Sequence, residues 1–521
     1  MLSPERGVDR MTASSGKYKP GFQESTHSGV RVTIYQHGID PVVAFPIGGT
    51  FPLDGRKRSD DAPSVIGVNT SKDMGSASGS FSIQLKPSAV AESLLDRLED
   101  DDWVDIEFLE HNRPYHVMRG LLDEIRSTKA VGGHGATMES FTLTGRDFGK
   151  IWETTPVWFS PLATNDIISQ AVAIEVFNGI PGVLGNPAQA VEAYLKSFLE
   201  QSSQQAGPNW NPPRGMPGII KDSFIPSVNF SSGGFRNVPE RINFNKNYLQ
   251  PNGTLWDLAV QHSDPLFCEV YADLQPHGNP YGAEIANRTA MEPKDTKMTV
   301  TVRDKPFPIS RTTQQMLPDY YEGIVPLIEI KRQDVLTADV GRSGIERFNA
   351  FYVASLILQE EMGSEALTLL SPLIDLEDVK LHGLRRMDVQ SSCAPSAKNI
   401  NAGLMAEQQR HLIRDWYCLN PYFLSGTITL GRGHPEIHIG NRVIIPGASI
   451  SRTEQLKDEI YYVESVSNNW QFGTPTQTVL GVTRGWRGDD DSYRRTLNQM
   501  VTKYTIPQVQ DEEVPVDPGE A

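Results

Sequence analysis

The sequence has few cysteines. Three occur in 521 residues, Cys268, Cys393 and Cys418, and they lie far apart with no CxxC pair. A disulfide framework and a structural zinc site both need cysteines in closer, paired spacing. No apolar run approaches the roughly 20 residues that a membrane helix needs, and residues 1–20 are too polar for a secretory signal. We therefore expect no membrane segment and synthesis in a reducing host cytoplasm.

Basic residues are also in deficit. Lys and Arg number 48 against 64 Asp and Glu, so the net charge is -16. This balance disfavours a basic nucleic-acid-binding surface and attraction to anionic lipid. Hydrophobic residues at 38% and charged residues at 21% are ordinary for a globular protein. The length exceeds what one hydrophobic core serves, so we expect three or four domains.

Specific catalytic motifs are absent from the sequence. It contains no GxSxG elbow, no P-loop and no HExxH. His434 and His438 would share one strand face, but a metal pair there would lack a third ligand, so we interpret them as exposed strand histidines. Asp489 to Asp491 lacks the ligand spacing of an EF-hand loop, and no carboxylate pair stands out as that of a glycosidase. We predict no catalytic residue, no cofactor and no metal.

The most informative stretch runs from Trp103 to Trp152. Apolar and acidic residues alternate over 103–108, which predicts a strand with one buried face. A return strand follows from Tyr115, with a bulge or a close backbone approach at Gly120. A third strand contains residues 141–147. Three antiparallel strands do not complete a domain, so other parts of the chain must close this sheet.

A weaker second copy of this pattern lies downstream. Residues 440–445, 461–466 and 478–485 parallel the three strands, although the inner loops differ in length. Two unrelated hairpins would also produce such alternation. We favour an internal duplication, which predicts two similar β domains in one chain.

Several blocks, in this order and spacing, resemble phage tail baseplate hub proteins. WVDIEF, MRGLLDEI and FTLTGRDFGKIWE are similar to the first tube-forming domain of those hubs. TLWDLAVQHSDPLFCEVYADL and MTVTVRDKPF are similar to the segment that starts their second such domain. GTITLGRGHPEIHIGNRVIIP and YYVESVSNNWQFGTPTQTVLGVTRG are similar to their closing region. The hub part of type VI secretion spike proteins is related to this family.

The resemblance implies an α+β, mainly β fold with two similar tube-forming β-barrel domains and smaller inserted mixed α/β domains. It implies a structural virion protein of the tail baseplate and no enzyme. Such hubs are homotrimers whose six barrels join a hexameric tail tube to a trimeric spike. The implied partners are a tail tube protein or tube-terminal ring protein, a spike protein, and wedge or tape-measure proteins. DNA would pass through the channel without specific binding.

Resemblance and periodicity together divide the chain into seven parts. In order, we expect a flexible N-terminus at 1–28, the first barrel domain at 29–155, a helical and irregular insertion with a long Gly/Pro loop at 156–250, a mixed α/β segment leading to the second barrel at 251–310, strands and a variable insertion at 311–402, the second barrel domain, completed by earlier strands, at 403–490, and an acidic disordered tail at 491–521.

The strands of the two barrels are predicted to form the ring interface. The candidate interface residues are Trp103, Asp105, Glu107, Arg146, Asp147, Asn441, Arg442 and Arg484. Arg146 and Asp147 are expected to pair with each other, across the interface or within a turn. Two other functions stay open at this point. A tail-associated cell-wall (peptidoglycan) hydrolase would need a cleft with a raised-pKa glutamate, and a carbohydrate-binding tail component would need a groove lined with aromatic side chains.

Overall fold

The computed structural model describes the strand-bearing parts of the chain. The described residues are 28–36, 41–46, 63–110, 113–131, 137–154, 229–233, 253–263, 268–276, 296–305, 325–355, 372–391, 416–450 and 456–487, with Val191, Leu195, Arg410, Ile413 and Arg414. The expected N-terminal segment, most of the Gly/Pro loop and the C-terminal tail lie outside these residues. Within them, no helix combines the length and the apolar character needed to cross a membrane.

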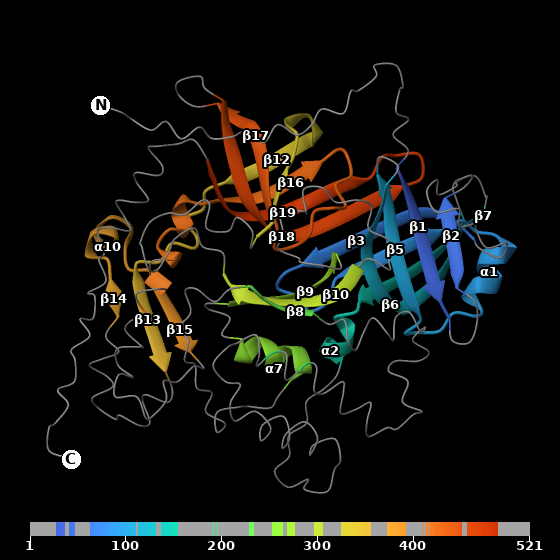
Figure 1. The fold of residues 1–521 in the computed structure, drawn as a ribbon, viewed down its shortest axis with the longest axis horizontal. Coiled ribbons are helices and arrows are strands. Elements are labelled where there is room, and N and C mark those ends of the chain that lie inside the picture. Colours follow the sequence, from blue (N-terminus) through green and yellow to red (C-terminus); the bar gives the residue numbers. More distant parts are fainter. Residues whose placement is uncertain are drawn as a thin grey trace, which may run out of the picture.

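Seven strands form a closed first barrel (Figure 1). They are β1 (Gly29–Tyr35), β2 (Val42–Pro46), β3 (Ser64–Asp73), β4 (Ser80–Leu85), β5 (Trp103–Glu110), β6 (Arg113–Val131) and β7 (Thr137–Asp147). Their order is β3-β2-β1-β5-β6-β7-β4, and pairing of β4 with β3 closes the ring. A helix, α1 (Ala89–Leu95), begins at the side-chain cap of Ser88 and connects β4 to β5.

Alternating apolar residues fill this barrel. Val104, Ile106 and Phe108 of β5 belong to one buried cluster with Val30 and Val32 of the neighbouring β1. Since successive strand residues point to opposite faces, the residues between them lie on the outer face of the barrel. The predicted close approach at Gly120 is confirmed, because a Cβ there would lie 2.3 Å from the carbonyl oxygen of Arg146 on β7.

Six strands build the second barrel. They are β11 (Leu327–Glu329), β12 (Val335–Gly341), β16 (Leu424–Leu430), β17 (Arg442–Ile450), β18 (Leu456–Gln471) and β19 (Gln477–Arg487). The sheet order is β12-β16-β19-β18-β17-β11. The single stretch 327–341 pairs with both edges, because β11 runs parallel to β17 and β12 runs antiparallel to β16. The 3-10 turn Arg332–Asp334 lies between the two strands.

Five strands of each barrel correspond in chain order and in sheet order. β3, β4, β5, β6 and β7 occupy the places of β12, β16, β17, β18 and β19. The irregularities correspond as well. Pairing of β3 with β4 shifts at Ile66 and pairing of β12 with β16 shifts at Leu336. The chain therefore contains the same strand arrangement twice.

The bulges of the two central hairpins each carry a carboxylate paired with an arginine, and the two arginines differ by one position in the register of the ladder. Asp123 occupies the bulge between β6 and β7, and Glu464 occupies the one between β18 and β19. Each carboxylate pairs with an arginine of the following strand, Asp123 with Arg146 at 2.9 Å and Glu464 with Arg484 at 2.7 Å. A repeated bulge with a repeated pair is a feature that two unrelated hairpins would not share.

One strand belongs to both barrels. The first half of β18 pairs with β17, and its second half, Ser465 to Gln471, pairs antiparallel with β3. This pairing joins the two barrels into one 13-stranded sheet. The indole of Trp470, near the end of β18, is buried in the core cluster of the first barrel.

Two smaller sheets are inserted between and beside the barrels (Figure 1). The central one has the order β8-β10-β9, formed by β8 (Asn229–Gly233), β9 (Cys268–Pro276) and β10 (Thr296–Asp304), and α7 (Leu255–His262) lies between β8 and β9 in the chain. The other has the order β14-β13-β15, formed by β13 (Ala350–Ser355), β14 (Leu373–Ile374) and β15 (Arg386–Ser391), with α10 (Leu376–His382). The remaining short helix, α2 (Lys150–Thr154), follows β7. The predicted fold class, α+β and mainly β with two barrels, is confirmed.

Candidate assembly site at the junction of the two barrels

The central sheet is bonded to the second barrel through one arginine. Arg303 of β10 pairs with Glu269 of the adjacent β9 at 2.5 Å. The same guanidinium donates to the Gly440 carbonyl at 2.8 Å and to the Tyr462 hydroxyl at 3.0 Å. Tyr462 in turn donates to Glu269 at 2.7 Å. Because these groups are buried and mutually bonded, they fix the central sheet against the loop and strand of the second barrel.

The φ of Gly440 explains why that loop approaches so closely. Its φ is +75°, and a Cβ at this position would lie 2.3 Å from the hydroxyl of Tyr271. A residue with a side chain would be strained by its backbone and would also collide with the tyrosine. Gly440 thus permits the contact between the loop and β9.

Where β1, β5 and the first half of β6 lie side by side, the outer face of the first barrel carries buried ion pairs instead of facing solvent. Arg31 of β1 pairs in bidentate fashion with Glu107 of β5, and both side chains are fully buried. Asp105 accepts from Arg119 at 2.7 and 3.1 Å and lies 3.2 Å from His116. The prediction of a strand with one buried face is therefore wrong for β5, all eight residues of which are buried. The acidic residues lie inside because cationic partners from β1 and β6 compensate their charge.

These charges have shifted pKa values. Burial would raise the pKa of Asp105, but the adjacent guanidinium of Arg119 and the imidazole of His116 hold it well below its usual range. Burial also raises the pKa of Glu107, against the opposing effect of Arg31. The other nitrogen of the His116 ring, Nδ1, lies 2.5 Å from the Thr296 hydroxyl at the start of β10. This contact connects the network on the first barrel to the central sheet.

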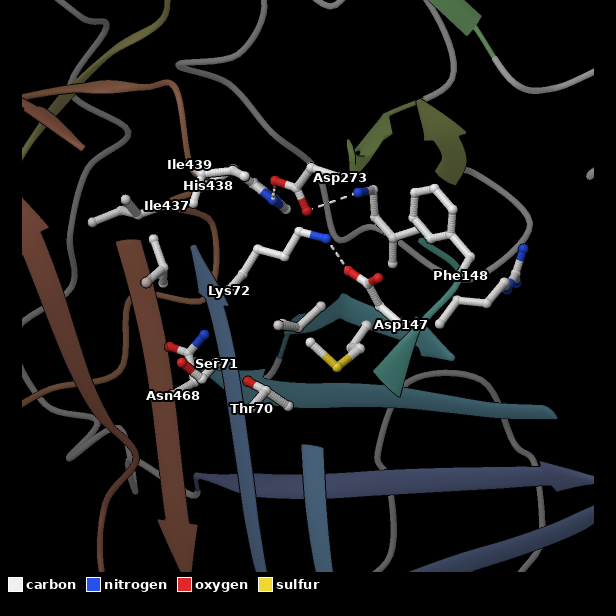
Figure 2. A pocket seen from close by; sticks show the side chains of 15 residues that line it. Thr70, Ser71, Lys72, Asp147, Phe148, Asp273, Ile437, His438, Ile439 and Asn468 are labelled. Atoms are coloured by element: carbon white, nitrogen blue, oxygen red, sulfur yellow. Dashed lines mark hydrogen bonds and ion pairs between the residues drawn. The ribbon is translucent and has the colours of Figure 1, made fainter. Parts of the chain in front are cut away.

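A small cavity lies where β3, β6, β9 and β18 meet the loop before β17 (Figure 2). Lys72 of β3 points across it and forms an ion pair with Asp147 of β7. On the opposite side, Asp273 of β9 lies 3.0 Å from the His438 imidazole. Burial raises the pKa of Asp147, although Lys72 and the Gly149 amide, which donates to it at 2.9 Å, oppose this effect. The pair of Lys72 with Asp147 connects β3 to β7 within the first barrel. The pair of Asp273 with His438 connects the central sheet to the loop before β17 of the second barrel.

A second titratable cluster surrounds His434, in the same loop before β17. Glu110 ends β5, and burial, reinforced by the nearby Glu436 carboxylate, raises its pKa to about 7. The His434 imidazole lies 2.8 Å from Glu436 and 3.6 Å from Asp334. Burial lowers the pKa of His434, but these carboxylates outweigh burial and raise it. The predicted exposed strand face for His434 and His438 is therefore wrong. Both are buried in the loop before β17, where the Glu436 carboxylate lies beside the His434 imidazole and the Asp273 carboxylate lies beside the His438 imidazole.

Arg146 and Asp147 do not pair with each other within the chain. Arg146 binds Asp123 and Glu153, and Asp147 binds Lys72. Adjacent strand residues point to opposite faces of the sheet, so each finds partners on its own side. Arg146 keeps about a third of its side chain exposed, at 36%.

The eight predicted interface residues divide by burial. Six are almost fully buried within one chain, namely Trp103, Asp105, Glu107, Asp147, Asn441 and Arg442. The Arg484 side chain is 14% exposed, and its guanidinium lies 4.5 Å from the centre of the Tyr462 ring. Arg146 has the largest exposed surface of the set. Their role in a ring interface stays a prediction, and the buried members could act there only by shaping the barrel.

Sequence reasoning missed the residues that connect the parts. Lys72, Glu269, Asp273 and Arg303 gave no motif of their own, and each has a partner that lies between 75 and 193 residues away. A buried charge inside an alternating strand could have signalled such partners. Among the described residues, no group of three His, Cys, Asp or Glu side chains could hold a metal ion. The arrangement provides rigid, charge-compensated contacts between segments.

No protein-family model matches the chain, and no curated protein sequence matches it. Among solved structures, it is similar to a tail protein from Neisseria meningitidis MC58, with 13% identity and a TM-score of 0.44 over 88% of this chain and 96% of the other. It is similar to the 43 kDa tail protein of prophage MuSo2 from Shewanella oneidensis, with 10% identity and a TM-score of 0.43 over 88% and 98%. An Escherichia coli component of the type VI secretion system, itself structurally similar to the bacteriophage T4 tail proteins gp27 and gp5, follows with 7% identity and a TM-score of 0.35 over 81% and 73%. Two of these three solved structures are tail proteins, and the third is a component of a type VI secretion system.

Proposed function

We propose that this chain is a structural component of a phage tail, the baseplate hub at the distal end of the tail tube. The observation that carries the proposal is the repeated barrel. Five strands recur in the same order with two matching bulges, and the shared strand β18 holds the two barrels side by side. We propose residues 29–155 as one ring-forming unit, and residues 403–490 with the stretch 327–341 as the other.

Duplication within a chain changes the symmetry that an assembly can present. Three copies of a chain with two similar barrels form a ring of six similar units, although the symmetry of the assembly is only threefold. Such a homotrimer would contact a sixfold tail tube protein or tube-terminal ring protein on one side. On the other side, its inserted sheets and loops would meet a threefold spike protein. Wedge or tape-measure proteins would be further neighbours.

The acidic balance of the chain supports passage of DNA through the ring without specific binding. A protein surface retains DNA through contacts of Lys and Arg side chains with the phosphates. In this chain, acidic residues outnumber basic ones and the net charge is -16. A negative channel wall would repel the DNA backbone and keep it moving. We therefore expect no retention of duplex DNA in a gel-shift assay at about 150 mM salt. At that ionic strength, interactions between exposed charges more than about 8 Å apart are largely screened.

Mass measurement tests the proposal directly. Size exclusion with light scattering over a range of concentrations should show a trimer, and negative-stain images should show a ring with six similar lobes. A chain that stays monomeric at all concentrations would contradict the hub function. Clearing of a peptidoglycan suspension by the pure protein would instead favour a cell-wall hydrolase.

A further inference from the structure

Two strand edges, on β12 and on the distal half of β6, are exposed and have no neighbouring strand among the described residues. β12 is paired with β16 on one side, and in the described part of the chain no strand pairs with its other side. Four consecutive residues of β12, from Leu336 to Asp339, are exposed, and Leu336 is 62% exposed. The distal half of β6 extends past the end of β5, which pairs with β6 only as far as Leu121. There the side chains of Arg126 and Lys129 are 65% and 63% exposed.

The corresponding edges inside the chain are paired with each other. β3 corresponds to β12, and its outer edge accepts the distal half of β18, the strand that corresponds to β6. At this junction Val68 and Thr70 of β3 and Asn468 and Trp470 of β18 are each only 2% exposed. The edges of β3 and β18 are thus covered by each other within the chain, whereas the equivalent edges of β12 and β6 are uncovered within the described residues.

The bulges set the register of this equivalence. Counting from the shifts at Ile66 and Leu336, Val68 corresponds to Ala338 and Asn69 to Asp339. Counting from the bulged Asp123 and Glu464, Asn469 corresponds to Thr128 and Trp470 to Lys129. In the chain, Val68 lies opposite Trp470, and Asn69 lies opposite Asn469.

We propose that β12 of one copy adds antiparallel to the distal half of β6 in a second copy, repeating between chains the junction that β3 and β18 form within one. In this register Ala338 faces Lys129, Asp339 faces Thr128 and Gly341 faces Arg126 of the neighbouring copy. The inference rests on the proposed hub function and specifies its protein–protein contact. Among the described residues each chain offers one such edge of each kind, so the contact is head-to-tail, and three copies related by threefold rotation close it into a ring.

The composition of the two edges agrees with this pairing. Asp339 would lie diagonally across from Arg126, on the same face of the joined sheet, at a spacing that long side chains bridge. Pairing would cover the open backbone groups of β12, which are otherwise a template for uncontrolled strand addition. It would also bury Leu336 and Ala338 near a neighbouring strand, as Ile66 and Val68 are positioned in the first barrel.

Disulfide trapping tests the register. The variants Asp339→Cys and Thr128→Cys, mixed and oxidised, should form a covalent dimer, and the double variant should form a covalent trimer on a non-reducing gel. Glu124→Cys is the matched control, since it lies on the same face of β6 but four residues along, about 13 Å away at the strand rise. The wild-type chain, with its three native cysteines, controls for background cross-links.

A charge exchange gives an independent readout. Asp339→Lys should raise the trimer dissociation constant several-fold by placing a cation near Arg126, and adding Arg126→Asp should restore it. A trimer that forms with no cross-link at Thr128, or with equal cross-linking at Glu124, would overturn the inference while leaving the hub function in place. A chain that is monomeric throughout would overturn both.

Discussion

Neutralising Asp105 is the sharpest test of how the outer face of the first barrel is held. Asp105→Asn keeps the size of the side chain but removes its charge. Arg119, which is fully buried and donates to both carboxylate oxygens, would then lose its ion-pair partner. Removing one partner of a buried ion pair costs about 3–5 kcal/mol, because the remaining charge stays away from water. We expect a loss of stability in this range for the first barrel.

The effect should depend on pH in one direction. The pKa of Asp105 is lowered in the folded protein, against about 3.9 in an unfolded chain. The charge therefore contributes its full stabilisation above about pH 4, and the contribution is lost as the pH falls toward the folded pKa. The stability difference between wild type and Asp105→Asn should be constant from pH 8 to pH 5 and should shrink below pH 4.

Urea denaturation gives the overall difference, and hydrogen exchange of peptides from residues 103–131 reports the local one. Glu124→Gln is the matched control, since its ion pair with Arg126 is 46% and 65% exposed and exposed pairs contribute about 0–1 kcal/mol. A variant within about 0.5 kcal/mol of wild type, in the range of ordinary surface substitutions, would refute the view that Asp105 compensates a buried cation.

Three further outcomes follow from the contacts described. Gly120→Ala should lower the melting temperature clearly, because the new Cβ would lie 2.3 Å from the Arg146 carbonyl oxygen, whereas Gly344→Ala, with no atom within 4 Å, should not. The pKa of Glu110 is raised to about 7, so its contribution to stability is full below about pH 4.3 and is lost as the pH rises through 7; Glu110→Gln should flatten that decline in melting curves taken from pH 4 to pH 8. Trp470→Ala should cost about 3–5 kcal/mol and increase exchange in the first barrel, while Phe472→Ala, 50% exposed, should have little effect by the same assay. Equal melting temperatures for Gly120→Ala and Gly344→Ala, or equal stabilities for Trp470→Ala and Phe472→Ala, would contradict the contact at Gly120 or at Trp470. A pH profile of Glu110→Gln identical to that of the wild type would contradict the raised pKa of Glu110.

The sequence predicted the two hairpin sheets because each has a local signal. Residues 104–108 alternate at the period of a strand, and the strands that follow residues 104–108 and 440–445 keep the same order along the chain. Gly120 was identified because a glycine inside a strand pattern has a limited set of structural causes. The duplication follows from strand order alone, and the structure adds the matched bulges and ion pairs.

The burial of Asp105 and Glu107 could not be predicted in the same way. An alternating acidic face has the same sequence pattern whether it meets water or arginine side chains. Glu107 is compensated by Arg31, 76 residues earlier in the chain. Only the three-dimensional arrangement brings that partner near, so the pattern alone favoured solvent.

Two other errors have different causes. The mistaken pair of Arg146 with Asp147 was avoidable, because neighbours in a strand point to opposite faces. The histidines at 434 and 438 were placed on a strand, but the chain there turns before β17 begins at Arg442. Gly433 and Gly440 bracket that turn and were available as a signal in the sequence.

The shared strand β18 ties the geometry of the two barrels to a single hydrogen-bond ladder. A one-residue insertion between Glu464 and Ser465 would move every side chain of the distal half to the opposite face, taking Trp470 out of the first barrel. It would also turn one barrel about the other by changing where the ladder begins. The angle between the two barrels of one chain therefore depends on the length and register of β18. A change in that angle would also change the core of the first barrel, because Trp470 of the same strand is packed there.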